Sequence, residues 1–131
     1  MKSNIVIAIF GALAFLLTGS QAYAQEAKSP TQFTLGIVSE YTVGFILPSV
    51  LIVDERGKVE GITLTLTNHT NKEQGFTIDK FGVKEVLKPG ETKTIQLSAT
   101  DLDGIGTDQS VFPYYNQLDA DHIGGALYIK R

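Results

Sequence analysis

Three polar side chains that could bind a metal ion recur at a three-residue step near the end of the sequence. Asn116, Asp119 and His122 supply an amide, a carboxylate and an imidazole in a loop between an aromatic segment (112–115) and an apolar one (126–129). Both segments are expected to be β-strands. Side chains spaced in this way can surround one small centre, most naturally a metal ion. The same residues could also simply close the end of a barrel, so the spacing leaves both interpretations open.

The sequence contains no cysteine. This excludes thiolate catalysis, zinc–thiolate sites and cysteine-ligated copper centres. No serine lies in a nucleophile motif, and Asp119 with His122 is weak support for acid–base catalysis, because two such residues often share a loop by chance. The chain is therefore expected not to be an enzyme.

The first 24 residues have the pattern of a signal peptide. Lys2 supplies a positive charge, residues 5–17 form an apolar run, and Ala22-Tyr-Ala24 has the small residues that signal peptidase recognises. The run is short for a membrane span. We therefore expect cleavage after Ala24, export to the periplasm or secretion, and no stable membrane span afterwards. A retained N-terminal anchor is the alternative.

Residues 25–131 are predicted to form one domain, in which 25–47 holds a leader and the first strands and 48–131 holds the core. The formal charge of −3 for the whole chain becomes about −4 once Lys2 is removed. This mild acidity provides no basic surface for nucleic acid or for an anionic membrane.

The pattern after residue 32 indicates β-structure throughout. Residues 61–67 alternate strictly between apolar and polar, which predicts a strand with its threonines toward water. Lys88-Pro-Gly-Glu91 has Pro and Gly where a type II turn favours them, and residues 100–109, with three aspartates and two glycines, are expected to be an exposed loop. Further strands are expected at 33–38, 41–47, 50–53, 76–79, 83–87 and 92–98. The predicted fold is an all-β Greek-key sandwich or barrel.

Three stretches of the sequence resemble the cupredoxins. They are Asn68 … Gln74-Gly-Phe-Thr-Ile78, Val86 … Lys88-Pro-Gly-Glu-Thr92, and Phe112-Pro-Tyr-Tyr-Asn-Gln-Leu-Asp-Ala-Asp-His122 … Gly125. The similarity spans about residues 48–129 and is greatest to the single-domain periplasmic type that includes the red copper protein nitrosocyanin. It implies a cupredoxin-type Greek-key fold.

The resemblance also implies which positions correspond to copper ligands. In the family one ligand precedes the Gly-Phe pair, usually His, or Glu in the nitrosocyanin-like branch; here that position is Gln74. The others follow the pattern Cys-x-x-His with a further His or Met. The cysteine position is Asn116 here, and the first loop histidine is Asp119. Only His122 keeps a ligand type of the family, so the framework is present while the ligands are largely replaced.

Two functions from different classes follow. The first is an exported cupredoxin-fold protein with a degenerate copper site, acting as a non-redox binding or accessory module that docks to a periplasmic redox or metal-handling protein. The second is a weak non-blue copper- or zinc-binding protein, or an electron-transfer relative, that uses His122, Asp119 and Gln74. His69 is expected to be an exposed turn histidine, and its use as a replacement ligand is left open. Convergence of the four predicted side chains on one point would favour the second. A hydrogen bond between Gln74 and Asn116 would instead mean a site repacked as a polar plug.

Overall fold

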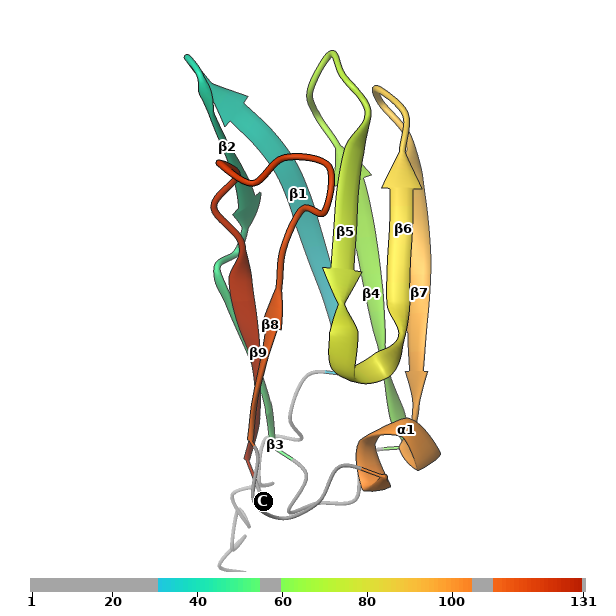
Figure 1. Ribbon diagram of the computed structural model, residues 1–131. Helices are drawn as coiled ribbons and strands as arrows, with labels where there is room; N and C mark the ends of the chain where they lie inside the picture. Colours follow the sequence, from blue (N-terminus) through green and yellow to red (C-terminus); the bar gives the residue numbers. More distant parts are fainter. Residues whose placement is uncertain (1–30, 55–59, 105–109, 131) are drawn as a thin grey trace, which may run out of the picture.

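The computed structural model describes residues 31–54, 60–104 and 110–130, which form a two-layer β-sandwich (Figure 1). The signal-peptide prediction, with its cleavage after Ala24, lies outside these residues. The described elements are β1 (Gln32–Glu40), β2 (Val43–Leu47), β3 (Val50–Asp54), β4 (Gly61–Asn68), β5 (Gln74–Ile78), the 3₁₀ turn η2 (Asp79–Phe81), β6 (Val83–Leu87), β7 (Thr92–Ser98), α1 (Ala99–Asp103), β8 (Val111–Tyr114) and β9 (Gly125–Lys130).

The strands divide into two layers that the chain crosses in Greek-key fashion (Figure 1). The first layer is the sheet β2-β1-β4-β7, and the second combines the pair β5-β6 with the sheet β3-β9-β8. Thr77 and Tyr115 join the two parts of the second layer by exchanging backbone hydrogen bonds of 2.8 and 3.1 Å. β4 and β7 pair in one layer, while β5 and β6, which lie between them in the sequence, pair in the other. The prediction of an all-β sandwich is confirmed.

β1 belongs to the segment 25–47 that the sequence assigns to a leader and first strands. It lies inside the first layer, antiparallel to β2 and parallel to β4, with Gln32 opposite Thr63. Its side chains Leu35 and Ile37 are fully buried in the core. β1 therefore shares one core with the strands that follow residue 48.

Apolar side chains from both layers fill the space between them. In β4, Ile62, Leu64 and Leu66 are at most 2% exposed, while the threonines between them are partly exposed on the outer face. This confirms the strand predicted from the period-two alternation. In the second layer, the rings of Phe76 and Tyr114 lie with their centroids 5.7 Å apart, so the core continues across the junction of β5 and β8.

The segment after β7 differs from the prediction. An exposed loop was expected from residue 100, but Ala99–Asp103 forms the helix α1. Ser98 and Asp101 make a capping box, in which the Asp101 carboxylate accepts from the Ser98 amide at 2.8 Å and Ser98 Oγ accepts from the Asp101 amide at 3.2 Å. Leu102 is 1% exposed and holds the helix against the sandwich. Neither α1 nor η2, the helices of the described residues, is long and apolar enough to cross a membrane.

Asn68 closes the end of β4 with a fully buried side chain. The sequence places it in a polar turn, but it acts as a connector of three backbone segments. Its Nδ2 donates to the carbonyls of Lys72, Leu87 and Lys88 at 2.8, 3.0 and 3.1 Å. Its Oδ1 accepts from the amide and the hydroxyl of Thr70, at 2.9 and 2.8 Å.

We predict that Asn68→Ala lowers the free energy of unfolding by about 2 to 3 kcal/mol, because buried carbonyls lose their donor. Urea denaturation measures the change. The matched control is Asn71→Ala, which removes an exposed amide from the same turn and should cost less than about 0.5 kcal/mol. Equal losses in the two variants would contradict the role given to Asn68.

Tyr114 ties β8 to the bend between β2 and β3. Its side chain is 1% exposed, and its hydroxyl donates to the carbonyl of Pro48. Burial raises the pKa of Tyr114 to about 12, against an ordinary value of 10.0. Between these two pH values the unfolded chain loses this proton while the folded chain keeps it. Stability that is fully present below pH 10 is therefore lost as the pH rises toward 12.

We predict that this loss amounts to about 2 to 3 kcal/mol for the wild-type chain. Tyr114→Phe removes the titrating group, so its unfolding free energy should fall by that much less over the same pH range. Denaturant unfolding at a series of alkaline pH values measures both curves. Parallel curves for the two proteins would show that Tyr114 does not titrate with unfolding.

Candidate functional site

The loop between β8 and β9 lies at one end of the sandwich, beside β5 (Figure 1). Asn116 is its buried anchor, with 3% of its surface exposed. Its Oδ1 accepts from the backbone amides of Gly75 at 2.7 Å and of Leu118 at 3.0 Å. Two backbone donors fix the oxygen of the carboxamide on that side. The amino group of Asn116 must therefore point the other way.

The amino group of Asn116 joins the other two buried side chains of the predicted site. Asn116 Nδ2 donates to Gln74 Oε1 at 2.6 Å and lies 3.2 Å from His122 Nδ1. Gln74 and His122 are 6% and 7% exposed. The structure thus brings three of the four predicted residues into one hydrogen-bonded group, which we call the amide cluster: Gln74, Asn116 and His122.

Asp119, the fourth predicted residue, does not join the amide cluster. Its side chain is exposed, and its Oδ1 accepts from the backbone amide of Asp121 at 3.1 Å. Its own amide lies 3.4 Å from the carbonyl of Asn116. The Asp119 carboxylate therefore stabilises the turn of the loop and lies outside the amide cluster.

His69, the proposed replacement ligand, lies on the other side of the first layer. Its ring covers Gly36 of β1, where an added Cβ would come 3.2 Å from His69 Cδ2. Leu35 and Ile37, on either side of Gly36, point into the core, so His69 is on the outer face. The His122 ring instead lies over Gly44, a buried residue of β2. The structure does not bring the two histidines together.

The contacts of Asn116 determine the tautomer of the neutral His122 ring. An amide nitrogen can only donate, so His122 Nδ1 must accept, and the ring hydrogen is on Nε2. His122 Nε2 is buried and has no hydrogen-bond partner within the described part of the chain. The cluster therefore presents a buried N–H at its far side.

Residues that the sequence analysis did not select extend the cluster. Gln74 Nε2 donates to Thr70 Oγ1 at 3.0 Å, and Thr70 Oγ1 donates to Asn68 Oδ1 at 2.8 Å. The Asn-x-Thr spacing at the end of a strand is a signal of a local side-chain turn that could have indicated these contacts. Through them, the cluster is continuous with the connector at the end of β4.

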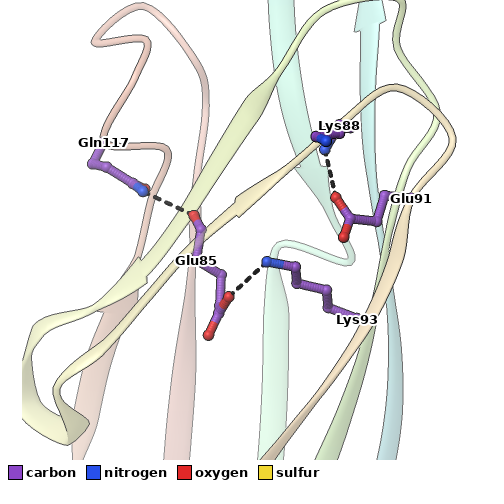
Figure 2. Close-up of polar contacts among 5 residues, drawn as sticks. All are labelled: Glu85, Lys88, Glu91, Lys93 and Gln117. Carbon is purple, nitrogen blue, oxygen red and sulfur yellow. Dashed lines mark hydrogen bonds and ion pairs between the residues drawn. The ribbon is translucent and has the colours of Figure 1, made fainter.

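Gln117 attaches the loop to β5 and β6 of the second layer, and Figure 2 shows its contact with Glu85. Its Nε2 donates to the carbonyl of Glu85 in β6 at 2.8 Å, and its Oε1 accepts from the hydroxyl of Thr77 in β5 at 2.8 Å. The Glu85 carboxylate in turn pairs with Lys93 of β7 at 3.0 Å. The same ion pair raises the pKa of Lys93. The loop that carries Asn116 is therefore fixed at several points.

This arrangement does not fit a copper or zinc ion. The centre of the cluster is an amino group with two hydrogens, and the lone pairs that face it are already used. Across the described residues, no group of three or more His, Cys, Asp or Glu side chains could hold a metal ion together. One imidazole and two amides are also a weak donor set for either metal.

We predict that Gly44→Ala disrupts the amide cluster, because the new Cβ would overlap the His122 ring and lie 2.8 Å from its Cγ. The expected loss is about 1 to 3 kcal/mol of unfolding free energy, with changed NMR signals for His122 and Asn116. Gly36→Ala is the control, because its Cβ would come no closer than 3.2 Å to the exposed His69 ring and 4.0 Å to Val38. An unchanged His122 signal in Gly44→Ala would contradict the packing described.

No family model matches the sequence, and no curated protein matches it. Among solved structures, the fold is similar to a blue copper oxidase from Nitrosomonas europaea, with 14% identity and a TM-score of 0.48. It is also similar to the multicopper oxidase mgLAC, with 13% identity and a TM-score of 0.50. Each match covers 76% of this chain and 38% of the other, so the chain spans little more than a third of those structures. At such identities the likeness concerns the fold alone, and the chain has a cupredoxin-like fold.

Proposed function

We propose that this protein is an exported cupredoxin-fold module whose copper position is closed, and that it works without redox chemistry as a binding or accessory protein. The observation that carries this proposal is the position of Asn116. The resemblance equates it with the copper-binding cysteine, and its amino group is bonded to the side chains at two other ligand positions. At this end of the sandwich, hydrogen bonds among these side chains take the place of bonds to a copper ion.

Other features support the finer parts of the proposal. The signal-peptide pattern that ends at Ala24 supports export to the periplasm or secretion. Gln74 is the amide counterpart of the Glu that precedes the Gly-Phe pair in the nitrosocyanin-like branch, which supports a relation to that branch. A fold shared with copper proteins supports a redox or metal-handling protein as the partner.

The proposed module is not an enzyme. The solved structures of similar fold are described as oxidases, but their activity belongs to chains more than twice as long as the matched part. The proposal rests instead on this chain's own residues, since hydrogen bonds already join Gln74, Asn116 and His122 within the amide cluster.

A second function, weak binding of copper or zinc, has one observation in its favour. His122 Nε2 is buried and lacks a partner in the described residues, so it could face a ligand. To coordinate a metal, however, it must first lose its hydrogen. If that hydrogen moved to Nδ1, it would face the Asn116 amino group, which is also a donor, at 3.2 Å. The contacts therefore favour the first function.

We predict that residues 25–131 bind neither Cu(II) nor Zn(II) at micromolar protein concentration. Isothermal calorimetry measures this, with His122→Ala as the control for any binding through the imidazole. Submicromolar binding that the substitution abolishes would establish the second function and overturn the first.

Whether these positions can form a copper site can be tested by restoring the ligand residues of the family. The triple variant Gln74→His, Asn116→Cys and Asp119→His supplies the family's ligand types beside His122, so it should bind Cu(II) and show a thiolate-to-copper absorption band in the visible range. A matched variant that keeps Asn116 should show no such band. A colourless triple variant that is folded would show that these positions do not form a copper site.

A further inference from the structure

At the centre of the amide cluster, an amino group of the protein lies where a metal site would have its cation. We propose that the Asn116 amino group takes the place of a metal ion. By donating to Nδ1 of His122, it keeps the ring hydrogen on Nε2 and so excludes metal ions from the cluster. This inference rests on the proposed function, because it explains how the position remains closed. Asn116 is thus a positioning residue that acts through the ring of His122.

Hydrogen bonds fix the orientation of the Asn116 and Gln74 carboxamides. Its oxygen is held by the amides of Gly75 and Leu118, at 2.7 and 3.0 Å. Gln74 is held by its own amino group, which donates to Thr70 Oγ1 at 3.0 Å. Gln74 must therefore present its oxygen to Asn116, and it cannot rotate without losing a buried hydrogen bond.

Two lone pairs converge on the amino group of Asn116. Gln74 Oε1 and His122 Nδ1 both face Asn116 Nδ2, at 2.6 and 3.2 Å, and each takes one of its two hydrogens. Metal ligands converge on an ion in the same way. A cation that entered the cluster would have to displace this amino group, whose carboxamide oxygen is held by two backbone amides.

The far side of the His122 ring carries a hydrogen-bond donor. With Nδ1 accepting, Nε2 carries the ring hydrogen, so the buried atom without a partner is a donor. A donor cannot coordinate a metal ion. One residue, Asn116, thus closes both nitrogens of the imidazole to metals, Nδ1 by occupying it and Nε2 by keeping it protonated.

The inference predicts that a change of one functional group opens the site. Asn116→Asp keeps an oxygen for the amides of Gly75 and Leu118 and replaces the donor with a carboxylate oxygen. Gln74 must therefore turn its amino group toward that oxygen and give up its bond to Thr70. Nδ1 of His122 should then carry the hydrogen and donate it to the carboxylate. This leaves a lone pair on Nε2, in the carboxylate–histidine arrangement that supports bound metals.

Gln74→Glu is the matched control. It introduces the same negative charge into the same cluster with the same small change of shape, but it retains the Asn116 donor. The His122 ring should then keep its hydrogen on Nε2. A change of tautomer in both variants would mean that the negative charge, and not the Asn116 donor, determines the tautomer of the His122 ring.

The experiment is long-range ¹H–¹⁵N correlation NMR of the ¹⁵N-labelled wild type and both variants at one mildly alkaline pH, with His69 as the internal reference. The expected result is hydrogen on Nε2 in the wild type and in Gln74→Glu, and hydrogen on Nδ1 in Asn116→Asp. Titration with Zn(II) alone should show binding to Asn116→Asp at least about 10-fold tighter than to the wild type.

The outcomes separate this inference from the proposed function. Hydrogen on Nδ1 in the wild type overturns the inference, even if the wild type binds no metal, and this measurement needs no variant to fold. An Asn116→Asp protein that is folded but keeps both the wild-type tautomer and the wild-type affinity for Zn(II) also overturns it. Tight Zn(II) binding by the wild type would instead overturn the proposed function.

Discussion

The orientation of the Asn116 carboxamide is the constraint on which this end of the molecule depends. Two backbone amides hold its oxygen, and from that follow the contacts of Gln74 and His122 and the tautomer of the ring. The hydrogen bonds continue through Thr70 to Asn68, which fastens the ends of β4 and β6. The site and the closure of the sandwich therefore share one continuous network of hydrogen bonds.

Much of the fold was predictable because strand signals are local. The alternation in residues 61–67 depends only on which side chains face the core, and it matched β4. The helix α1 does not follow from composition, because aspartates are common in loops, whereas here Ser98 and Asp101 satisfy each other's backbone amides in a capping box. The joining of β5 to β8 was not predictable, since it depends on residues far apart in the sequence.

The sequence indicated which residues meet at the candidate site better than it indicated how they interact. Spacing and resemblance selected Gln74, Asn116 and His122, which the fold brings together. They also selected Asp119, whose direction is set by a local contact with the Asp121 amide. The decisive orientation of Asn116 depends on the amide of Gly75, 41 positions earlier. No sequence pattern records which end of a carboxamide meets such a donor.

The pairing of β3 with β9 has a consequence for how the chain folds. It places Val50 opposite Ala126, so strands separated by more than half of the sequence must meet in parallel. The parallel pairing of β1 with β4 adds a second distant contact. Such contacts give the domain a high contact order, for which folding times on the order of milliseconds to seconds are typical. Because β9 lies between β3 and β8, neither of these strands has its neighbour within that sheet until residues 125–130 are in place.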